Sequence, residues 1–173
     1  MKPARCFLLL CVSVVLAAQA RALPLPDACG QDTVRFNVTT QAAQPAPVAP
    51  EAGKALIVLI EDQNGKSSMF SSGATVRFGL DGAWVGADKG NSFFALDVAP
   101  GLHHLCASLQ GAPVESMTFD LAPVNAEAGK VYYFAAQVTE VQPYFNFGLS
   151  QLNDDQGQYR LKFWTRSTSK PHR

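Results

Sequence analysis

The sequence predicts an all-β fold, an antiparallel β-sandwich of about eight to ten short strands. From Lys54 onward, short runs of β-forming residues are separated by glycine, proline, asparagine and aspartate. Several of these runs alternate between apolar and polar side chains, as residues 75–80 (TVRFGL) do. No long stretch has the period of an amphipathic helix. These observations favour stacked sheets over a helical or mixed fold.

The predicted strands follow one another with turn residues between them. They are residues 33–38 (TVRFNV), 54–61 (KALIVLIE), 74–80 (ATVRFGL), 83–86 (AWVG), 92–98 (SFFALDV), 102–109 (LHHLCASL), 115–121 (ESMTFDL), 130–141 (KVYYFAAQVTEV), 144–152 (YFNFGLSQL) and 158–164 (QYRLKFW). In the last run, alternation places Tyr159, Leu161 and Phe163 on one buried face.

Three turn sequences, at four places in the chain, predict specific turns between the strands. Asp81 and Gly82 separate two alternating runs, which predicts a two-residue hairpin with positive φ at both positions. The tetrapeptide EAGK occurs at 51–54 and again at 127–130, each time directly before an apolar strand. We interpret it as a turn in which glycine supplies the bend and lysine marks the solvated start of the strand. Residues 153–158 (NDDQGQ) predict a further turn.

Composition divides the chain into five parts. Residues 1–22 are a predicted signal peptide, 23–40 an N-terminal strand segment, 41–53 a Pro/Ala-rich connector, 54–166 the β-sandwich domain and 167–173 a polar tail.

The first segment has the three features of a secretory signal. Lys2 and Arg5 precede the apolar run FLLLCVSVVLAA, and the small-residue site ARA ends at Ala22, so the mature chain is expected to begin at Leu23. The apolar run is too short for a membrane-spanning helix, and no later segment comes closer. We therefore expect an exported protein without an integral span, in the periplasm, the cell envelope or outside the cell.

Charge argues against one class of partner. Cleavage removes Lys2, Arg5 and Arg21, which lowers the count of basic residues from 14 to 11 against 14 acidic residues. The mature chain is mildly acidic, whereas nucleic-acid binders carry a clustered basic face. We expect no nucleic-acid partner.

Cysteine usage predicts one disulfide. Cys6 and Cys11 leave with the signal peptide, so the mature chain keeps only Cys29 and Cys106. An even pair in an oxidising compartment is expected to be bonded. The bond would hold the N-terminal segment against the strand at 102–109.

The sequence LHHLCASL raises the question of a metal or catalytic site. In a strand, His103 and His104 point to opposite faces and cannot bind one metal together. The bonded Cys106 cannot act as a nucleophile, and no catalytic motif occurs elsewhere. The acidic residues, among them Glu61, Asp62 and Asp88, are interpreted as solvated turn residues. We expect no catalytic residues, no bound metal and no cofactor.

Aromatic residues are the remaining candidates for a binding surface. Alternation assigns Phe145 and Phe147 to a buried face, but it leaves Tyr144 on the opposite one. Trp84 lies next to the predicted hairpin turn, and Trp164 falls on the polar face of the last predicted strand. The candidate ligand or partner surface therefore consists of Trp84, Tyr144 and Trp164.

Several motifs in order resemble a bacterial family of exported domains that is catalogued only as a domain of unknown function. They are DGAWVG at 81–86, an aromatic strand at 92–98, PGLH at 100–103 and AGKVYY at 128–133. The first half is also similar to PEGA-type surface domains, which have a small immunoglobulin-like β-sandwich fold. The resemblance implies an envelope-associated, non-catalytic β domain, and it gives His103 a structural role after the turn.

These observations predict a non-catalytic binding or structural module of the cell envelope, with an envelope protein or a glycan as its unknown partner. Two alternatives stay open. The chain could be an enzyme acting on envelope polysaccharide, or a subunit of a larger envelope assembly that uses an exposed edge strand.

Overall fold

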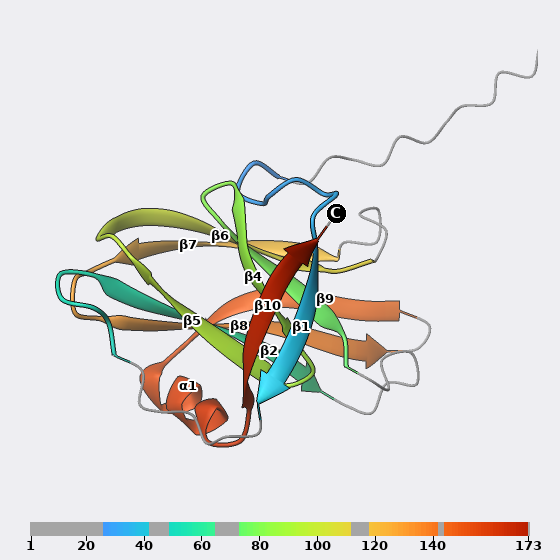
Figure 1. Ribbon diagram of the computed structural model, residues 1–173. Coiled ribbons are helices and arrows are strands. Elements are labelled where there is room, and N and C mark those ends of the chain that lie inside the picture. Colours follow the sequence, from blue (N-terminus) through green and yellow to red (C-terminus); the bar gives the residue numbers. More distant parts are fainter. Residues whose placement is uncertain (1–25, 42–48, 65–72, 112–117, 142–143, 173) are drawn as a thin grey trace, which may run out of the picture.

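The computed structural model describes residues 26–41, 49–64, 73–111, 118–141 and 144–172, so the predicted signal peptide and most of the Pro/Ala-rich connector lie outside the described residues. The predicted all-β sandwich is confirmed (Figure 1). Its elements are β1 (Arg35–Gln41), β2 (Ala55–Asn64), β3 (Thr75–Leu80), β4 (Ala83–Lys89), β5 (Ser92–Val98), β6 (Gly101–Leu109), β7 (Phe119–Ala126), β8 (Val131–Val141), β9 (Tyr144–Leu152), α1 (Asp154–Leu161) and β10 (Thr165–His172).

The strands form two sheets. The larger has six strands in the order β1-β10-β5-β2-β8-β9, and the smaller has four in the order β4-β3-β6-β7. Most neighbours are antiparallel, but β2 with β8 and β5 with β10 are parallel pairs. The core lies between the sheets, where alternate residues of each strand meet, among them Ile57, Leu59, Val76, Phe78, Leu105 and Phe134.

A second apolar cluster covers the outer face of the larger sheet. It joins Val58 and Ile60 of β2 to Phe93 of β5 and to Leu161 of α1. The helix therefore packs on the outer face of the central strands, and in the view of Figure 1 it lies below them. A β-sheet with apolar residues on both faces needs such a cover to exclude water from its outer face.

The two EAGK turns lie side by side at the start of β2 and β8. Each closes with a hydrogen bond from the lysine N–H to the glutamate carbonyl, from Lys54 to Glu51 and from Lys130 to Glu127. Each glycine has a positive φ, and the Gly129 N–H donates to the Lys54 carbonyl at 2.8 Å. The interpretation of EAGK as a turn is confirmed, and the repeat launches two parallel neighbours.

The predicted hairpin between β3 and β4 is also confirmed. Asp81 and Gly82 have φ values of 50° and 88°. Both are positive, as a tight two-residue hairpin of this kind requires. Just before this turn, the pairing register between β3 and β4 shifts between Phe78 and Gly79. Such a bulge changes which face the following side chains occupy.

Polar side chains join the two sheets along both edges. On one side, the Asp120 carboxylate of β7 accepts hydrogen bonds from the backbone N–H of Leu121 and from that of Leu149 in β9, each at 2.8 Å. On the other, Ser169 of β10 accepts from the Ala87 N–H of β4 at 3.1 Å. These bonds occupy edge groups that would otherwise be open to pairing with another chain.

Residues 154–161 form a helix, which corrects the prediction of a turn followed by a strand. The Asn153 side chain accepts from the Gln156 N–H at 2.9 Å, and the Gln156 side chain accepts from the Asn153 N–H at 3.2 Å. This capping box, with Asp154 and Asp155 in the first turn, stabilises a helix start.

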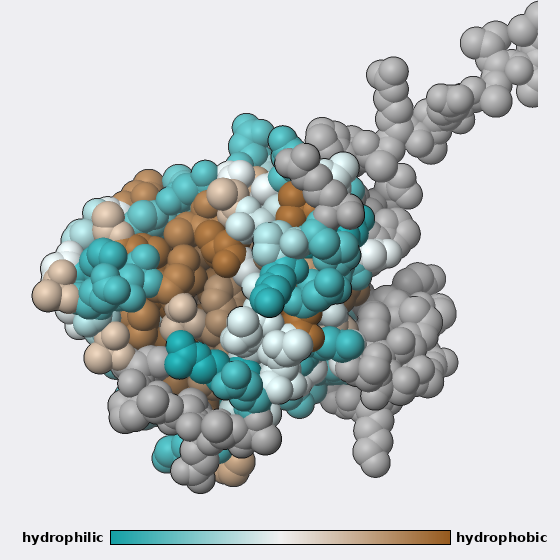
Figure 2. Space-filling view, viewed as in Figure 1, coloured by the Kyte–Doolittle hydropathy of each residue, from teal (hydrophilic) through white to brown (hydrophobic). Residues whose placement is uncertain are grey.

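Residues 167–172 of the predicted polar tail belong to strand β10, and residue 173 lies outside the described residues. This strand pairs with β1 from Arg166, opposite Gln41, to His172, opposite Arg35. It is polar because most of its side chains face solvent, and Figure 2 shows hydrophilic surface over β1 and β10 beside an apolar area. Backbone pairing, rather than an apolar face, therefore defines the strand.

Three acidic residues lie in strands rather than in solvated turns. Glu61 and Asp62 are buried in β2, and Asp88 is buried in β4. The Asp62 carboxylate is paired with the Arg160 guanidinium of α1 at 2.7 Å, which accounts for its burial and ties the helix to the sheet.

Candidate binding surface

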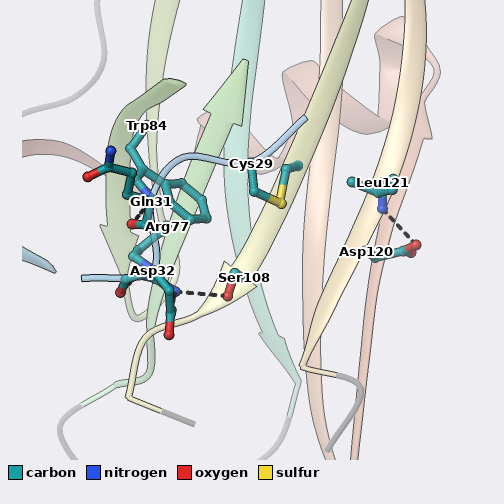
Figure 3. The surroundings of a disulfide bond; sticks show 9 residues. Cys29, Gln31, Asp32, Arg77, Trp84, Ser108, Asp120 and Leu121 are labelled. Atoms are coloured by element: carbon teal, nitrogen blue, oxygen red, sulfur yellow. Dashed lines mark hydrogen bonds and ion pairs between the residues drawn. A yellow bond between two sulfur atoms is a disulfide. The ribbon is translucent and has the colours of Figure 1, made fainter. Parts of the chain in front are cut away.

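The Cys29–Cys106 disulfide is present, as predicted. The two Cα atoms lie 5.2 Å apart, and both residues are buried. The bond fixes residues 28–32, here called the clamp segment, to the outer face of β6 (Figure 3). Cys106 is therefore a structural cysteine, and its sulfur is not free to bind a metal.

A glycine on β3 lets the clamp segment approach the sheet. A Cβ atom at Gly79 would lie 3.1 Å from the Ala28 carbonyl oxygen and 3.2 Å from the Cys29 Cα. The Ala28 carbonyl also accepts a hydrogen bond from the Gly82 N–H at 3.2 Å. A side chain at position 79 would push the segment off the sheet.

Arg77 binds the end of the clamp segment and Val34, two residues beyond it. Its guanidinium donates to the carbonyl of Val34 at 2.7 Å and to the carboxylate and carbonyl of Asp32, both at 3.1 Å. It also donates to the Ser108 hydroxyl at 3.2 Å, the dashed line in Figure 3. Only 2% of Arg77 is exposed. A planar guanidinium suits this role because it offers several fixed donors at once.

Trp84 lies over the same guanidinium. The Arg77 guanidinium carbon is 4.4 Å from the centre of the Trp84 ring, and the indole N–H donates to the Gln31 carbonyl at 2.8 Å. A Cβ at Gly30 would fall 2.2 Å from the ring, so the backbone there touches it directly. Trp84, a predicted surface aromatic, is half-buried because it holds the clamp segment.

The two adjacent histidines are separated as strand geometry predicts. The His103 ring contacts the Asp81 carboxylate at 2.7 Å and the Ala99 carbonyl at 2.8 Å, whereas the His104 side chain is exposed. His103 therefore links the turn before β6 to the hairpin turn after β3. Among the described residues, no group of three or more His, Cys, Asp or Glu could hold a metal ion.

The structure does not bring the predicted surface aromatics together. Trp164 lies at the opposite sheet, where its indole N–H donates to the Glu61 carbonyl at 3.0 Å and its ring contacts the apolar cluster under α1. Tyr144 begins β9, and its side chain lies outside the described residues. Trp84 and Trp164 thus serve two separate structural contacts.

A different pair of aromatic rings is exposed. Tyr159 and Phe163 are 59% and 66% exposed, and their ring centres lie 5.0 Å apart. They are four residues apart on and just beyond α1, the spacing that places side chains on one helix face. Alternation missed them because the same two residues also fit one face of a strand. The capping box at Asn153 was the signal that could have identified the helix.

The helix that presents this pair is held firmly. Leu161 is buried, and Arg160 is paired with Asp62. Gly157 meets the Tyr133 ring so closely that a Cβ atom would lie 2.2 Å from it. The close contact needs a glycine, and it fixes the helix at a short distance from β8.

An open depression of about 1050 Å³ adjoins the same helix. Its lining is largely polar and includes Tyr132, Gln151, Asn153, Asp154, Asp155 and Gln158. Asp155 lies one helical turn before Tyr159, on the same face. The depression therefore adjoins the helix face that carries the aromatic pair, although neither ring lines it, and the two together are here called the α1 surface.

Comparison of the chain with protein-family models, curated proteins and solved structures gave no match. Among the described residues, no helix has the length and apolar character needed to cross a membrane.

Proposed function

We propose that the chain is an exported, non-catalytic binding module of the bacterial cell envelope, and that the α1 surface is its ligand site. The observation that carries this proposal is the exposed pair of aromatic rings, Tyr159 and Phe163, on a helix fixed to the sheet. Exposed aromatic side chains in contact with each other are a common feature of binding surfaces.

Export is supported by the buried disulfide. A bond between Cys29 and Cys106 persists in an oxidising compartment and is rare in the cytosol. The predicted signal peptide leads to the same compartment. Sequencing the N-terminus of protein purified from the native envelope should find Leu23 as its first residue. An intact Met1 would contradict the proposal of export by cleavage.

The chemistry of the α1 surface favours a glycan as the ligand. A sugar ring has an apolar face of C–H groups and an edge of hydroxyl groups. Tyr159 and Phe163 offer flat apolar faces, and Gln151, Asn153 and Gln158 offer amide donors and acceptors in the lining of the depression. An open depression suits part of a long chain better than an enclosed small molecule.

The arrangement of titratable groups favours a binding module over a polysaccharide-acting enzyme. Among the described residues, Glu61 and Asp88 are the acidic residues whose pKa values are raised, and both are completely buried between the sheets. A glycoside hydrolase needs an acid with a raised pKa at the substrate. In this fold such acids lie away from the α1 surface, inside the core.

Binding of soluble oligosaccharides prepared from envelope polysaccharide, measured by calorimetry, tests the proposal. Tyr159→Ala and Phe163→Ala should each weaken binding about tenfold, which corresponds to about 1.4 kcal/mol. Leu102→Ala is the matched control, because Leu102 is 63% exposed but lies on the other sheet. A different result would contradict the choice of a glycan: no oligosaccharide binds, and an envelope protein crosslinks to the wild type but not to Tyr159→Ala. The ligand of the α1 surface would then be a protein.

A further inference from the structure

Two carboxyl groups are enclosed in the core and form no ion pair with another residue of the described part of the chain. Glu61 of β2 and Asp88 of β4 are both 0% exposed. Glu61 follows the inward-facing Leu59 by two residues, and Asp88 lies opposite the inward-facing Val76. Each carboxyl therefore comes from a different sheet and faces the space between them.

Each carboxyl has one bonded and one unbonded oxygen. Glu61 Oε2 accepts a hydrogen bond from the Gly90 N–H at 2.8 Å, and Asp88 Oδ1 accepts one from the Ser167 hydroxyl. Glu61 Oε1 and Asp88 Oδ2 are buried and have no hydrogen-bond partner among the residues that the structure describes. A bare carboxylate oxygen in a dry interior is costly, whereas a protonated one is neutral and can donate.

The groups around the pair do not neutralise two negative charges. The Lys89 ammonium acts favourably on Glu61, and the Ser92 hydroxyl lies beside Asp88. On the other face of β2, Asp62 already has Arg160 as its partner. Burial raises the pKa of Glu61 to about 8. Burial and the nearby Glu61 charge raise the pKa of Asp88 well above its usual range.

We propose that Glu61 and Asp88 form a proton-binding pair that holds the two sheets together while both carboxyls are protonated and separates them when the carboxyls ionise. The separation would begin where Ser167 and Ser169 of β10 bond to β4, here called the β4–β10 seam. Each ionisation releases one proton from a carboxyl O–H to solvent and leaves one negative charge between the sheets. This inference does not depend on the ligand of the α1 surface.

The seam is the part of the sandwich that such charges would loosen first. Ser167 donates to Asp88 and, in a longer contact of 3.4 Å, to the Ala87 carbonyl, so β10 is bonded directly to the strand that carries the charge. The bond to Asp88 favours the ionised carboxylate, but water that enters to solvate the two charges competes for the same hydroxyl. β10 is paired with β5 at only two positions, and its other neighbour, β1, depends on it for a place in the sheet. Ionisation should therefore release β1 and β10 before the central strands.

Linkage gives the direction of the pH effect. A carboxyl whose pKa is raised in the folded state binds more protons there than in the unfolded chain, so stability falls as pH rises. For Glu61 the window runs from its ordinary value of 4.5 to about 8. Within it, the unfolding equilibrium constant should increase up to about tenfold per pH unit for each titrating group. The raised pKa of His103 also lowers stability as pH rises above its ordinary pKa of 6.5. The contribution of His103 to the measured slope therefore has to be subtracted.

Urea unfolding of the full mature protein at half-unit pH steps from 5 to 9 tests the proposal. Glu61→Gln and Asp88→Asn should each reduce the slope of the logarithm of the unfolding constant against pH, because an amide does not titrate. Asp62→Asn is the matched control: it removes a buried carboxylate beside Glu61 that already has Arg160 as its partner, and it should keep the wild-type slope. Equal slopes in the wild type and in both test variants would overturn the inference.

Two measurements on the wild type keep the test valid if a variant does not fold. Infrared spectroscopy should show a protonated carboxyl band at pH 6 that disappears at high pH, and amides of β1 and β10 should exchange faster over the same range. Absence of the band at pH 6 would contradict the proposal. A different outcome would show a cation site instead of a proton pair: calcium or sodium stabilises the wild type stoichiometrically at pH 7 but does not stabilise Glu61→Gln.

Discussion

The Arg77 guanidinium carbon lies 4.4 Å from the centre of the Trp84 ring, directly beneath the clamp segment. This contact joins two residues of adjacent strands, and both also bind the backbone of the clamp segment. A buried arginine that satisfies backbone carbonyls is a structural group, and an aromatic ring against its face strengthens it through a cation–π contact. The clamp segment is therefore held by the disulfide and by the arginine and tryptophan, which also contact each other.

Replacement of these residues should destabilise the fold in a coupled way. Arg77→Lys loses the forked donors to Asp32 and Val34 and should lower the free energy of unfolding by about 3 kcal/mol. Trp84→Ala should lower it by about 2 kcal/mol. Urea unfolding of both single variants and the double variant should give a coupling energy of about 1 kcal/mol. Strict additivity would show that the ring does not stabilise the guanidinium. The neighbouring, partly exposed Val85→Ala is the control.

Loss of the disulfide should release the clamp segment and leave the sandwich folded. The bond joins residues 77 positions apart, and closing a loop of that length stabilises a protein by about 4 kcal/mol in the chain-entropy model. Cys29→Ser should therefore lower the free energy of unfolding by several kcal/mol, with protease cleavage confined to the residues before β1. Non-reducing peptide mapping of the wild type should find Cys29 joined to Cys106. Free labelling of both thiols in oxidised native protein would contradict this.

Local sequence signals predicted the parts of the fold that depend on local chemistry. The Asp81-Gly82 turn needs positive φ at two positions, and few residue pairs other than this one supply it readily. The disulfide was predicted from the two cysteines that remain outside the predicted signal peptide. Strand alternation correctly separated His103 from His104.

Features that depend on tertiary context were missed. Residues 159–163 satisfy both a strand alternation and a helical spacing, and only the cap at Asn153 distinguishes them. Strand β10 has no apolar face, because it is defined by its pairing with β1. Burial of Glu61 and Asp88 could not be predicted, since sequence does not show which charged residues meet across two sheets.

The contact between Gly157 and Tyr133 should control how the α1 surface is presented. Gly157→Ala adds a methyl group where only 2.2 Å separates it from the ring, so the helix must move outward. We expect a loss of about 2 kcal/mol, although alanine favours helices by about 1 kcal/mol. Gln158→Ala, at an exposed position one residue on, should change stability by less than about 0.5 kcal/mol. Thermal and urea unfolding of the Gly157→Ala and Gln158→Ala variants measure the two changes in stability. A stabilised Gly157→Ala variant would show that the ring adapts without cost.

The two ring nitrogens of His103 both face acceptors, which makes this residue sensitive to pH. Nδ1 lies 2.7 Å from the Asp81 carboxylate, and Nε2 lies 2.8 Å from the Ala99 carbonyl. A neutral imidazole has one N–H and can donate to one of them, whereas the imidazolium donates to both. The hydrogen bond to Asp81, followed by that to Ala99, raises the pKa of His103 above its ordinary value of 6.5.

The stability that His103 supplies is complete below pH 6.5 and is lost as pH rises through the raised pKa of the folded protein. His103→Ala should therefore cost about 1–2 kcal/mol at pH 5 and clearly less at pH 9, measured by urea unfolding against the wild type at each pH. Because Glu61 and Asp88 titrate equally in both proteins, their contribution cancels in the difference. His104→Ala, on the exposed face of the same strand, is the control and should change stability by less than about 0.5 kcal/mol at either pH. An equal cost of His103→Ala at pH 5 and pH 9 would mean that the ring stabilises the turns by packing alone, without its second proton.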